Sequence, residues 1–323
     1  MSPRRQSGSS HTKGPRKGKA LKSLQHAAKA ARSGLRRYPR AILDSIVDPT
    51  AARLRARAGS SSAPPSLESH DLAAIWLGHA SVLLRFAGLT ILADPVFAHR
   101  IGVSLGPLSF GLPRHSPMPL KDEHLPSPDL VLISHAHFDH LDKPTLRRIA
   151  DEKTTVVTAR RTSRLIPRGF GNVIELDWDQ SLTFRGLHLS AIRPEHWGAR
   201  TALDRRRGFN SYILREGSPS GHARGVLMAG DTAYTDAFNK VSNLALAIMG
   251  IGAYEPWAHA HATPEETWDM FRASGAERLL PIHHSTFPLG DEQMDEPMQR
   301  LLTAAGDDAH RVIRAGMGDV WAA

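Results

Sequence analysis

The stretch Ser134-His-Ala-His-Phe-Asp-His-Leu-Asp142 decides how this chain folds around its chemistry. It follows the apolar run Leu130-Val-Leu-Ile133 directly and brings together His135, His137, Asp139 and His140. A short run of branched apolar residues predicts a buried strand, and the residues after a strand emerge at one edge of its sheet. Imidazole and carboxylate groups are the ligands that zinc and iron prefer. The stretch therefore predicts a metal site at a sheet edge.

The density of ligand-type side chains in this stretch indicates two adjacent ions. His135 and His137 would serve one ion, and Asp139 and His140 the other. The alternative is a surface loop that happens to be rich in histidine. The spacing His-x-His-x-Asp-His behind a strand favours the metal site over that alternative.

Composition limits which ligands a metal site can use. The chain has 323 residues, enough for one large domain or two modest ones with a proper core. It has no cysteine, which excludes disulfides, iron–sulfur clusters and thiolate zinc. Any metal must therefore be held by His, Asp and Glu, and the 18 histidines fit that demand.

The positive charge of the chain is concentrated at its N-terminal end. Residues 1–60 contain 15 Lys or Arg and two acidic residues, whereas the remainder carries a net charge of −4. The high isoelectric point therefore describes the tail and not the body. The sequence has no apolar run of transmembrane length and no secretory signal pattern. We expect a cytoplasmic protein with peripheral membrane contact.

Residues 1–68 are predicted to be a basic, partly disordered extension of a hydrolase domain at 69–323. Apolar residues at helical spacing between Leu21 and Ile42 indicate an amphipathic helix, and Gly59–Ser66 is a linker. The helix would lie on an anionic membrane or a partner, or would pack on the body. An arginine-rich, acid-poor N-terminus is also typical of an organelle transit peptide.

The body is rich in predicted strands. They cover 73–78, 81–86, 89–94, 130–133, 154–159, 172–178, 182–192, 209–215, 225–230, 244–250 and 278–283. Helices are predicted at 143–150, 234–240, 292–304 and, after the capping box Thr263-Pro-Glu-Glu266, up to Ser274. Strands and helices in both halves predict an α/β fold of layered sheets flanked by helices.

Three more candidate ligands follow predicted strands, as the histidine-rich stretch does. They are His196, Asp231 and one of the neighbours His283 and His284. Strand ends that converge on one rim would form a single site. Two neighbouring metals need a shared ligand, and a carboxylate can bridge them, so Asp231 is the predicted bridge. His135, His137 and His196 would complete one ion, and Asp139, His140 and His283 the other. Taken alone, His196 and Asp231 could each have a capping or turn role instead.

The body resembles the metallo-β-lactamase superfamily, and more closely the branch that contains N-acylphosphatidylethanolamine-hydrolysing phospholipase D. The resemblance spans about residues 74–288 and rests on short sequence motifs that occur in the same order as in the family. These are Trp76-Leu-Gly-His-Ala-Ser-Val82, Asp94-Pro-Val-Phe97, the stretch 134–142, Glu195-His-Trp197, Gly230-Asp-Thr232, Ile251-Gly-Ala-Tyr-Glu-Pro256, His261 before Thr263, and Ile282-His-His-Ser-Thr-Phe287. The basic tail lies outside it.

This resemblance implies a four-layer αββα sandwich of two mixed sheets flanked by helices, with two zinc ions at the sheet edge. It also implies cleavage of a phosphodiester by a hydroxide that bridges the two ions, with Asp139 and Asp231 holding them. His261 matches a family histidine near the substrate phosphate, which implies a catalytic role; a surface histidine before a helix is the alternative. His79 and Asp94 are expected to orient ligands, and Trp197 to line the pocket or to pack in the core. Iron or manganese would fit the same ligands.

The substrate is predicted by the branch and not by the fold. The first expectation is a phospholipase D-type enzyme acting on N-acylphosphatidylethanolamine-like lipids, with a lactonase or small phosphate-ester hydrolase as the rival. A nuclease or nucleic-acid-binding protein that uses the basic tail ranks lower. The acidic body and the single aromatic residue of the tail, Tyr38, argue against nucleic acid as partner. Where the family has an aromatic residue after its last ligand this chain has His284, so both His283 and His284 are candidates, with alignment favouring His283.

Overall fold

The computed structural model describes most of the predicted body. The described residues are Pro39, Leu43, 67–105, 108–120, 124–201, 204–217, 224–239 and 241–323. The predicted amphipathic helix and the linker therefore lie outside the described residues, apart from two isolated positions. The boundary between an extension at 1–68 and a domain at 69–323 stays a prediction.

Within the described residues, one sheet has seven strands in the order β15-β1-β2-β3-β6-β7-β8. They are β1 (Leu72–Gly78), β2 (Ser81–Phe86), β3 (Leu89–Ala93), β6 (Leu130–Ile133), β7 (Thr155–Ala159), β8 (Asn172–Leu176) and β15 (Val320–Ala322). From β15 to β3 neighbouring strands pair antiparallel, and from β3 to β8 they pair parallel. The sheet is mixed, as predicted.

The second sheet, again counted over the described part of the chain, has six strands in the order β14-β13-β12-β11-β10-β9. They are β9 (Ser181–Phe184), β10 (Leu187–Ile192), β11 (Ser211–Glu216), β12 (Gly225–Met228), β13 (Leu244–Gly250) and β14 (Arg278–Ile282). β12, β13 and β14 pair parallel, and the remaining pairs are antiparallel. A separate hairpin joins β4 (Arg100–Leu105) to β5 (Leu108–Pro113).

Alternating side chains along the strands divide the core into layers. On β12, Val226 and Met228 pack between the two sheets, whereas Leu227 packs outward. On β1, Ala74 lies between the sheets and Ile75 faces the other way. Because both faces of each sheet are covered, these strands are nearly continuous apolar runs. The largest core therefore fills the space between the sheets.

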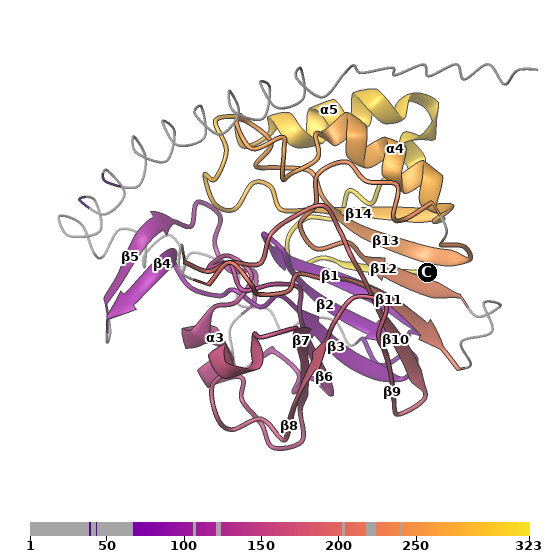
Figure 1. The fold of residues 1–323 in the computed structure, drawn as a ribbon. Helices are drawn as coiled ribbons and strands as arrows, with labels where there is room; N and C mark the ends of the chain where they lie inside the picture. Colours follow the sequence, from indigo (N-terminus) through magenta and orange to yellow (C-terminus); the bar gives the residue numbers. More distant parts are fainter. Residues whose placement is uncertain are drawn as a thin grey trace, which may run out of the picture.

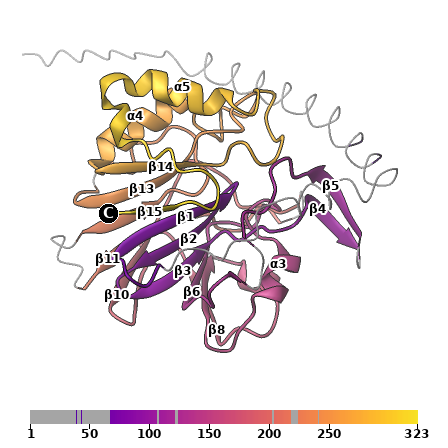
Figure 2. The same cartoon turned by 180° about the vertical axis from the view of Figure 1, so that it is seen from behind.

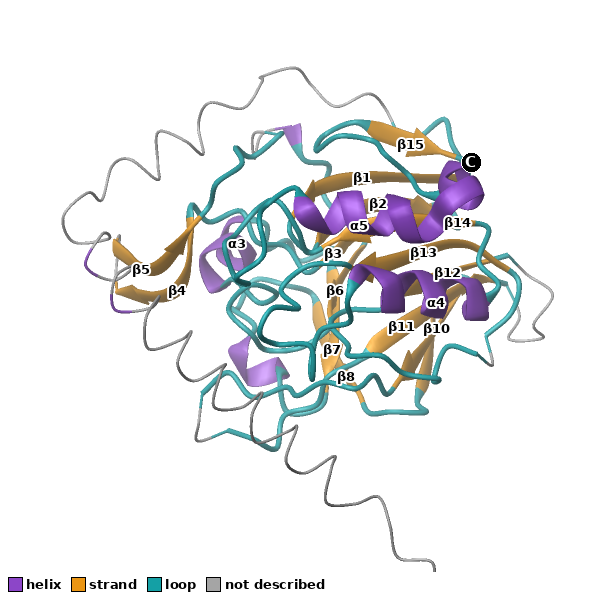
Figure 3. Cartoon of the chain, turned by 90° about the horizontal axis from the view of Figure 1, so that it is seen from above, coloured by secondary structure: helices purple, strands orange, loops and turns teal. Residues whose placement is uncertain are grey.

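Helices cover the two outer faces, which completes the predicted αββα sandwich (Figure 1). α3 (Lys143–Arg148) buries Leu146 against the first sheet. α4 (Pro264–Ser274) and α5 (Glu296–Ala305) lie over the second sheet, as the view from above also shows (Figure 3). Short 3-10 turns, η2 (Ser163–Leu165) and η3 (Gly306–Arg311), complete the described elements. None of the helices in the described ranges is long and apolar enough to cross a membrane.

Several predicted elements were wrong in detail. The single strand predicted at 182–192 is the hairpin β9–β10, because Arg185 and Gly186 turn the chain with positive φ angles of 46° and 84°. The helix predicted at 234–240 is absent from the described residues of that range, which form bends and turns. There the Thr235 hydroxyl accepts a hydrogen bond from the Ala237 N–H, a local bond that competes with helix formation. α5 begins four residues later than predicted.

Three strands were not predicted. β15 pairs with β1 at the edge of the first sheet, on the side seen in Figure 2. In the β4–β5 hairpin, Gly102 faces Gly111, and a Cβ on either glycine would come within 2.1 Å of a backbone oxygen of the opposite strand. The absence of a Cβ on these two glycines makes this close pairing possible.

Candidate metal centre

The histidine-rich stretch forms a tight loop at the end of β6. The loop closes on itself through a hydrogen bond from the Leu141 N–H to the His137 carbonyl (2.9 Å). Arg200 holds it from outside, because its Nη1 donates to the carbonyls of Ala136 and Leu141, each at 2.8 Å. Backbone and guanidinium together fix the direction of the side chains that the loop carries.

Asp94, at the end of β3, anchors the start of this loop. Its carboxylate accepts hydrogen bonds from the Ser134 N–H (2.7 Å) and the Ser134 hydroxyl (2.6 Å). It also accepts from the Nδ1–H of His140 (2.8 Å). The expectation that Asp94 orients ligands agrees with this geometry.

The structure brings every predicted ligand into one buried cluster. One group, whose ligand atoms lie within 4.8 Å of one another, contains His135, His137, His196 and Asp231. A second group on the same criterion contains His79, Asp139, His140 and His283. His196, Asp231 and His283 follow β10, β12 and β14, so strand ends from both sheets meet at this edge. Apart from His79, the two groups reproduce the division of ligands that the sequence predicts.

Asp231 lies between the two groups. Its Oδ2 is 3.0 Å from His140 Nε2 and 3.3 Å from His283 Nε2. The same oxygen is 3.8 Å from the Nε2 atoms of His135 and His196. A carboxylate that faces both groups occupies the position that a bridging ligand requires.

These spacings fit metal coordination. Two ligand atoms that each lie about 2.1 Å from one tetrahedral ion are about 3.4 Å apart, close to the separations around Asp231. His140 Nε2, Asp231 Oδ2 and His283 Nε2 are also buried atoms that make no hydrogen bond of acceptable geometry. Buried polar atoms without hydrogen bonds are rare, and atoms that converge in this way suit a cation.

Hydrogen bonds on the outer ring nitrogens leave the inner ones available. The Nδ1–H of His196 donates to the Ala260 carbonyl (3.0 Å), and that of His140 to Asp94. The Ser134 hydroxyl, which donates to Asp94, accepts from the Nδ1–H of His135 (2.9 Å). Each of these rings therefore directs its Nε2 toward the cluster, where a bound metal ion would take the place of any proton on that nitrogen.

The electrostatics of the cluster also suit cations. Burial raises the pKa of Asp231, but the facing imidazoles of His140 and His283 outweigh it and hold this pKa well below its ordinary value. Burial lowers the pKa of both histidines, yet Asp231 and Asp139 raise the pKa of His140 well above 6.5 and that of His283 to about 9. Burial dominates at His135, whose pKa falls well below 6.5. Metal ions bind ionised carboxylates and neutral imidazoles, so Asp231 and His135 are in the binding form, whereas a metal ion would displace a proton from His140 and His283.

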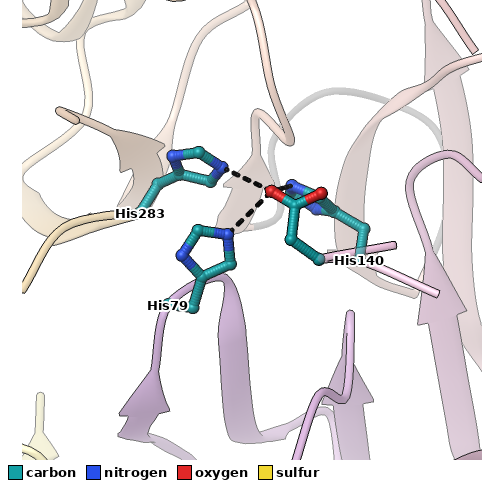
Figure 4. Close-up of side chains that lie close together, drawn as sticks. His79, His140 and His283 are labelled. Atoms are coloured by element: carbon teal, nitrogen blue, oxygen red, sulfur yellow. Dashed lines mark hydrogen bonds and ion pairs between the residues drawn. The ribbon is translucent and has the colours of Figure 1, made fainter. Parts of the chain in front are cut away.

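His79 lies closer to the ligands than the sequence indicated. Its Nε2 donates to Asp139 Oδ2 at 3.0 Å, and its ring centre is 4.0 Å from that of His283. Figure 4 shows His79, His140 and His283 pointing toward one another. His79 is therefore placed to hold Asp139 in position, and as a member of the second group it is also within reach of a metal.

His283 and not His284 reaches the cluster. His283 has a positive φ of 65°, which directs its Nε2 to within 3.4 Å of Asp139 Oδ2. The ring of His284 instead stacks on Trp76 with centres 4.5 Å apart, and its Nδ1 hydrogen-bonds with the Ser285 hydroxyl at 2.8 Å. The geometry therefore favours the same ligand as the alignment.

A pocket of about 370 Å³ opens onto the cluster. Its floor contains His137, Asp139 and Asp231, and His261 lies on its wall with Nδ1 3.8 Å from Asp231 Oδ2. Trp197 lines the pocket and is 40% exposed, so it faces the ligand space and not the core. His261 is thus close enough to act on a group bound at the floor.

Four further lining residues were not predicted from the sequence. Arg200 and Trp257 contribute a guanidinium and an indole, and Ile101 and Leu112 come from the β4–β5 hairpin. Arg200 lies four residues after His196, and Trp257 follows the family motif that ends at Pro256. Their closeness to these motifs is a sequence signal that marks both as candidate pocket residues. The hairpin residues carried no such signal, because their segment was not predicted to form strands.

Comparison with known proteins agrees with this geometry. Residues 90–284 match the family described as the beta-lactamase superfamily domain. An uncharacterized protein of Mycobacterium tuberculosis is 33% identical over 262 residues, which cover 74% of this chain and 65% of that protein. The chain thus matches just under two thirds of that relative.

Two other relatives have a stated activity. The N-acyl-phosphatidylethanolamine-hydrolyzing phospholipase D 1 of Caenorhabditis elegans is 31% identical, with coverage of 78% of this chain and 76% of the worm protein. The mitochondrial N-acyl-phosphatidylethanolamine-hydrolyzing phospholipase D of Saccharomyces cerevisiae is 32% identical, covering 70% of this chain and 50% of the yeast protein.

Solved structures share the fold at low sequence identity. The isothiocyanate hydrolase from Delia radicum gut bacteria has a TM-score of 0.59 at 16% identity, covering 77% of this chain and 98% of that one. CmlA, a diiron beta-hydroxylase from Streptomyces venezuelae, has a TM-score of 0.56 at 19% identity, with coverage of 79% and 54%. The fold therefore occurs with different reactions, one of them on a diiron protein.

Proposed function

The chain belongs to the metallo-β-lactamase superfamily and has the fold of its metal-dependent hydrolases, and from this we propose that it is a phosphodiesterase of phospholipase D type. The observation that carries the proposal is a pair of ligand groups beside one pocket, in which Asp231 belongs to the first group and lies 3.0 Å from His140 and 3.3 Å from His283 of the second. The named activity of the worm and yeast relatives supports N-acylphosphatidylethanolamine-like lipids as substrates.

We propose zinc as the metal, held by His135, His137 and His196 in one position and by Asp139, His140 and His283 in the other, with Asp231 shared. Nitrogen and carboxylate ligands without thiolate suit zinc, and they would also suit iron or manganese. Two such ions, when bound, lower the pKa of water and stabilise negative charge on phosphoryl oxygens.

The side chains around the pocket have separate tasks in this proposal. His261, 3.8 Å from Asp231, would hydrogen-bond the phosphate or the leaving oxygen. Arg200 brings a positive charge to the same pocket and would attract the phosphodiester. Ile101, Leu112 and Trp257 offer apolar surface to an acyl chain. A polar floor beneath apolar walls matches a substrate with one phosphate and long hydrocarbon chains.

The test is release of phosphatidic acid from N-acylphosphatidylethanolamine vesicles by zinc-loaded protein. The controls are chelated protein and Asp231→Ala. Metal-dependent release that the substitution abolishes is the expected result. Protein that holds metal but releases no phosphatidic acid would contradict the substrate, and lactones and small phosphate esters would then be assayed.

The surface beside the pocket supports contact with an anionic membrane as part of the same proposal. Lys143 of α3 interacts electrostatically with Arg147 on the same helix and with Arg200 and Arg207 from a separate segment. The β4–β5 hairpin, whose Val103 is 53% exposed, lies at the same end of the molecule as α3 in every view (Figures 1 to 3). Basic side chains next to exposed apolar ones favour a lipid interface over nucleic acid.

Sedimentation with vesicles tests this contact. Arg147→Glu, at an exposed position of α3, is expected to weaken binding to vesicles that contain phosphatidylglycerol, and Arg272→Glu, exposed on α4 in the other outer layer, is the matched control. A protein without residues 1–60 measures the contribution of the basic tail. Equal binding by all four proteins would contradict membrane contact through either surface, and salt-sensitive binding to RNA would point to the nucleic-acid alternative.

A further inference from the structure

We propose that Glu292 is a positioning residue, which fixes the pocket wall that carries Trp257 and His261. The inference rests on the proposed function, because it assigns a role in substrate turnover at the same pocket. Glu292 lies in the loop before α5 and directs its hydrogen bonds to backbone amides and not to a metal ligand, although its charge interacts with His283. It acts through the chain segment 252–262, which runs from the end of β13 to the start of α4 and is called the wall segment below.

Both carboxylate oxygens of Glu292 bind the backbone of the wall segment. Oε1 accepts a hydrogen bond from the Ala253 N–H (2.5 Å), and Oε2 accepts from the Glu255 N–H (3.3 Å). The Asp291 N–H donates in return to the Glu255 carbonyl (2.6 Å). One carboxylate thus satisfies the backbone N–H groups of Ala253 and Glu255, one with each oxygen.

The wall segment needs such support because its backbone is strained. Ala253 lines the pocket with a φ of 60°, a left-handed conformation that is unfavourable for a residue with a Cβ. On the other side, Gly290 lies so close to the carboxylate of Glu292 that a Cβ there would be 1.8 Å from Oε2. The carboxylate is therefore enclosed between the two segments, with little freedom to choose other partners.

A second contact supports the same segment from α5. The hydroxyl of Tyr254 donates to Glu296 Oε1 (2.7 Å), and the guanidinium of Arg300 lies over the Tyr254 ring at 4.7 Å. Arg300 also binds both carboxylate oxygens of Glu265 in the first turn of α4, at 2.9 and 2.7 Å. α5 and the loop before it thus hold the beginning of the wall segment against the helix that follows it.

The rest of the wall segment carries the groups that face the pocket. The N–H groups of Ala260 and His261 both donate to the Trp257 carbonyl, at 2.8 and 3.0 Å, so these residues form one compact turn. Trp257 and His261 line the pocket. The ligands on the β6 loop and Asp231 belong to other segments, and the wall contacts the first ligand group at the Ala260 carbonyl, which accepts a hydrogen bond from the Nδ1–H of His196. A shift of the wall would therefore act mainly on the substrate-facing groups, and His196 is a ligand that it reaches directly.

Glu292→Gln is the direct test. The glutamine has the same size, but its NH₂ group would face one of the two backbone N–H donors. At saturating zinc we expect metal content and thermal midpoint close to wild type, with a fall in kcat/KM of about tenfold or more on N-acylphosphatidylethanolamine. The change should appear in both KM and kcat, because Trp257 and His261 move together, whereas a simple loss of folded protein would lower the apparent kcat alone. Glu277→Gln, at an exposed ion pair with Arg224, is the matched control.

Two further measurements keep the proposal open to refutation. Tyr254→Phe removes only the hydroxyl bond to Glu296 and should lower kcat/KM several-fold. This variant tests the proposal even if the glutamine variant fails to fold. If the wild-type protein does not turn over the lipid, hydrogen exchange of metal-loaded protein replaces the kinetic assay. Glu292→Gln should then accelerate exchange of the Ala253 and Glu255 amides at least tenfold. Wild-type kinetics in both variants, or unchanged exchange at these amides, would overturn the positioning role.

Discussion

Substitution of Asp94 by Asn tests how the hydrogen bonds behind the cluster control metal binding. Asparagine keeps the size of the side chain and one acceptor for the Ser134 N–H. Its NH₂ group, however, would face either the Ser134 hydroxyl or the Nδ1–H of His140, both of which now donate to the carboxylate. Metal binding needs a neutral His140 ring, and in the variant relief of that conflict would leave its one proton on Nε2, the nitrogen that lies 3.0 Å from Asp231 and points into the cluster.

The size of the effect follows from the bond that is lost. A hydrogen bond to an ionised group contributes about 1.5–3 kcal/mol, which corresponds to about 10- to 150-fold in a binding constant. Loss of a hydrogen-bond partner of a metal ligand lowers metal affinity by about 10–100-fold, in the same range. We expect a loss of this size for the ion held by Asp139, His140 and His283, and little change for the other ion.

Competition titration with a zinc chelator measures both affinities. Asp129→Asn is the matched control, because Asp129 accepts from the Thr90 N–H at 3.0 Å and pairs with Arg185 far from the ligand groups. Wild-type affinity at both positions in the Asp94 variant would show that this carboxylate does not set the proton on His140, and would refute the reasoning.

Three further outcomes are expected. Because the pKa of His283 is raised to about 9 and that of His140 is raised well above 6.5, zinc binding should displace protons from these rings. Calorimetry in buffers of different ionisation enthalpy measures the release, and no release would contradict it. Metal affinity should therefore fall as the pH is lowered. Phe271→Ala, on the buried face of α4, should lower the free energy of unfolding by about 3–5 kcal/mol in urea titrations. Thr263→Ala, which breaks the capping box with Glu266, should cost about 1 kcal/mol in the same assay.

The sequence predicted the sheets well where strands are buried on both faces. Runs such as Leu130–Ile133 and Leu244–Gly250 are apolar throughout, and the structure buries them between helices and the other sheet. The start of α4 was also predictable, because the capping box and Pro264 act within one turn. A capping box or a continuous apolar run involves only a few neighbouring residues, so the sequence alone is enough to predict the helix start or the buried strand.

Elements that depend on distant partners were missed. The short strand β15 exists because Val320–Ala322 pairs with β1, nearly 250 positions earlier in the chain. The β4–β5 hairpin relies on two glycines that face each other across the strands, and a single sequence shows them only as flexible residues. The helix predicted near Phe238 failed because a buried aromatic anchor and a local threonine bond hold turns there instead.

For the site, the sequence predicted which residues gather but not how they are supported. The ligands follow strands, so a simple topological rule placed them at one edge. Arg200 donates hydrogen bonds to carbonyls of the β6 loop, one of them 59 positions away in the sequence. Glu292 accepts a hydrogen bond from the wall segment across 39 positions. Such contacts have no local pattern and appear only once the chain is folded.

The central claim is a two-metal centre in which Asp231 is shared, and counting bound metal tests it most directly. Elemental analysis of protein freed of excess zinc should give about two ions per chain for the wild type and fewer for Asp231→Ala, since both positions lose a ligand. A wild-type protein that saturates at one ion, or an Asp231→Ala variant that still holds two, would contradict the account.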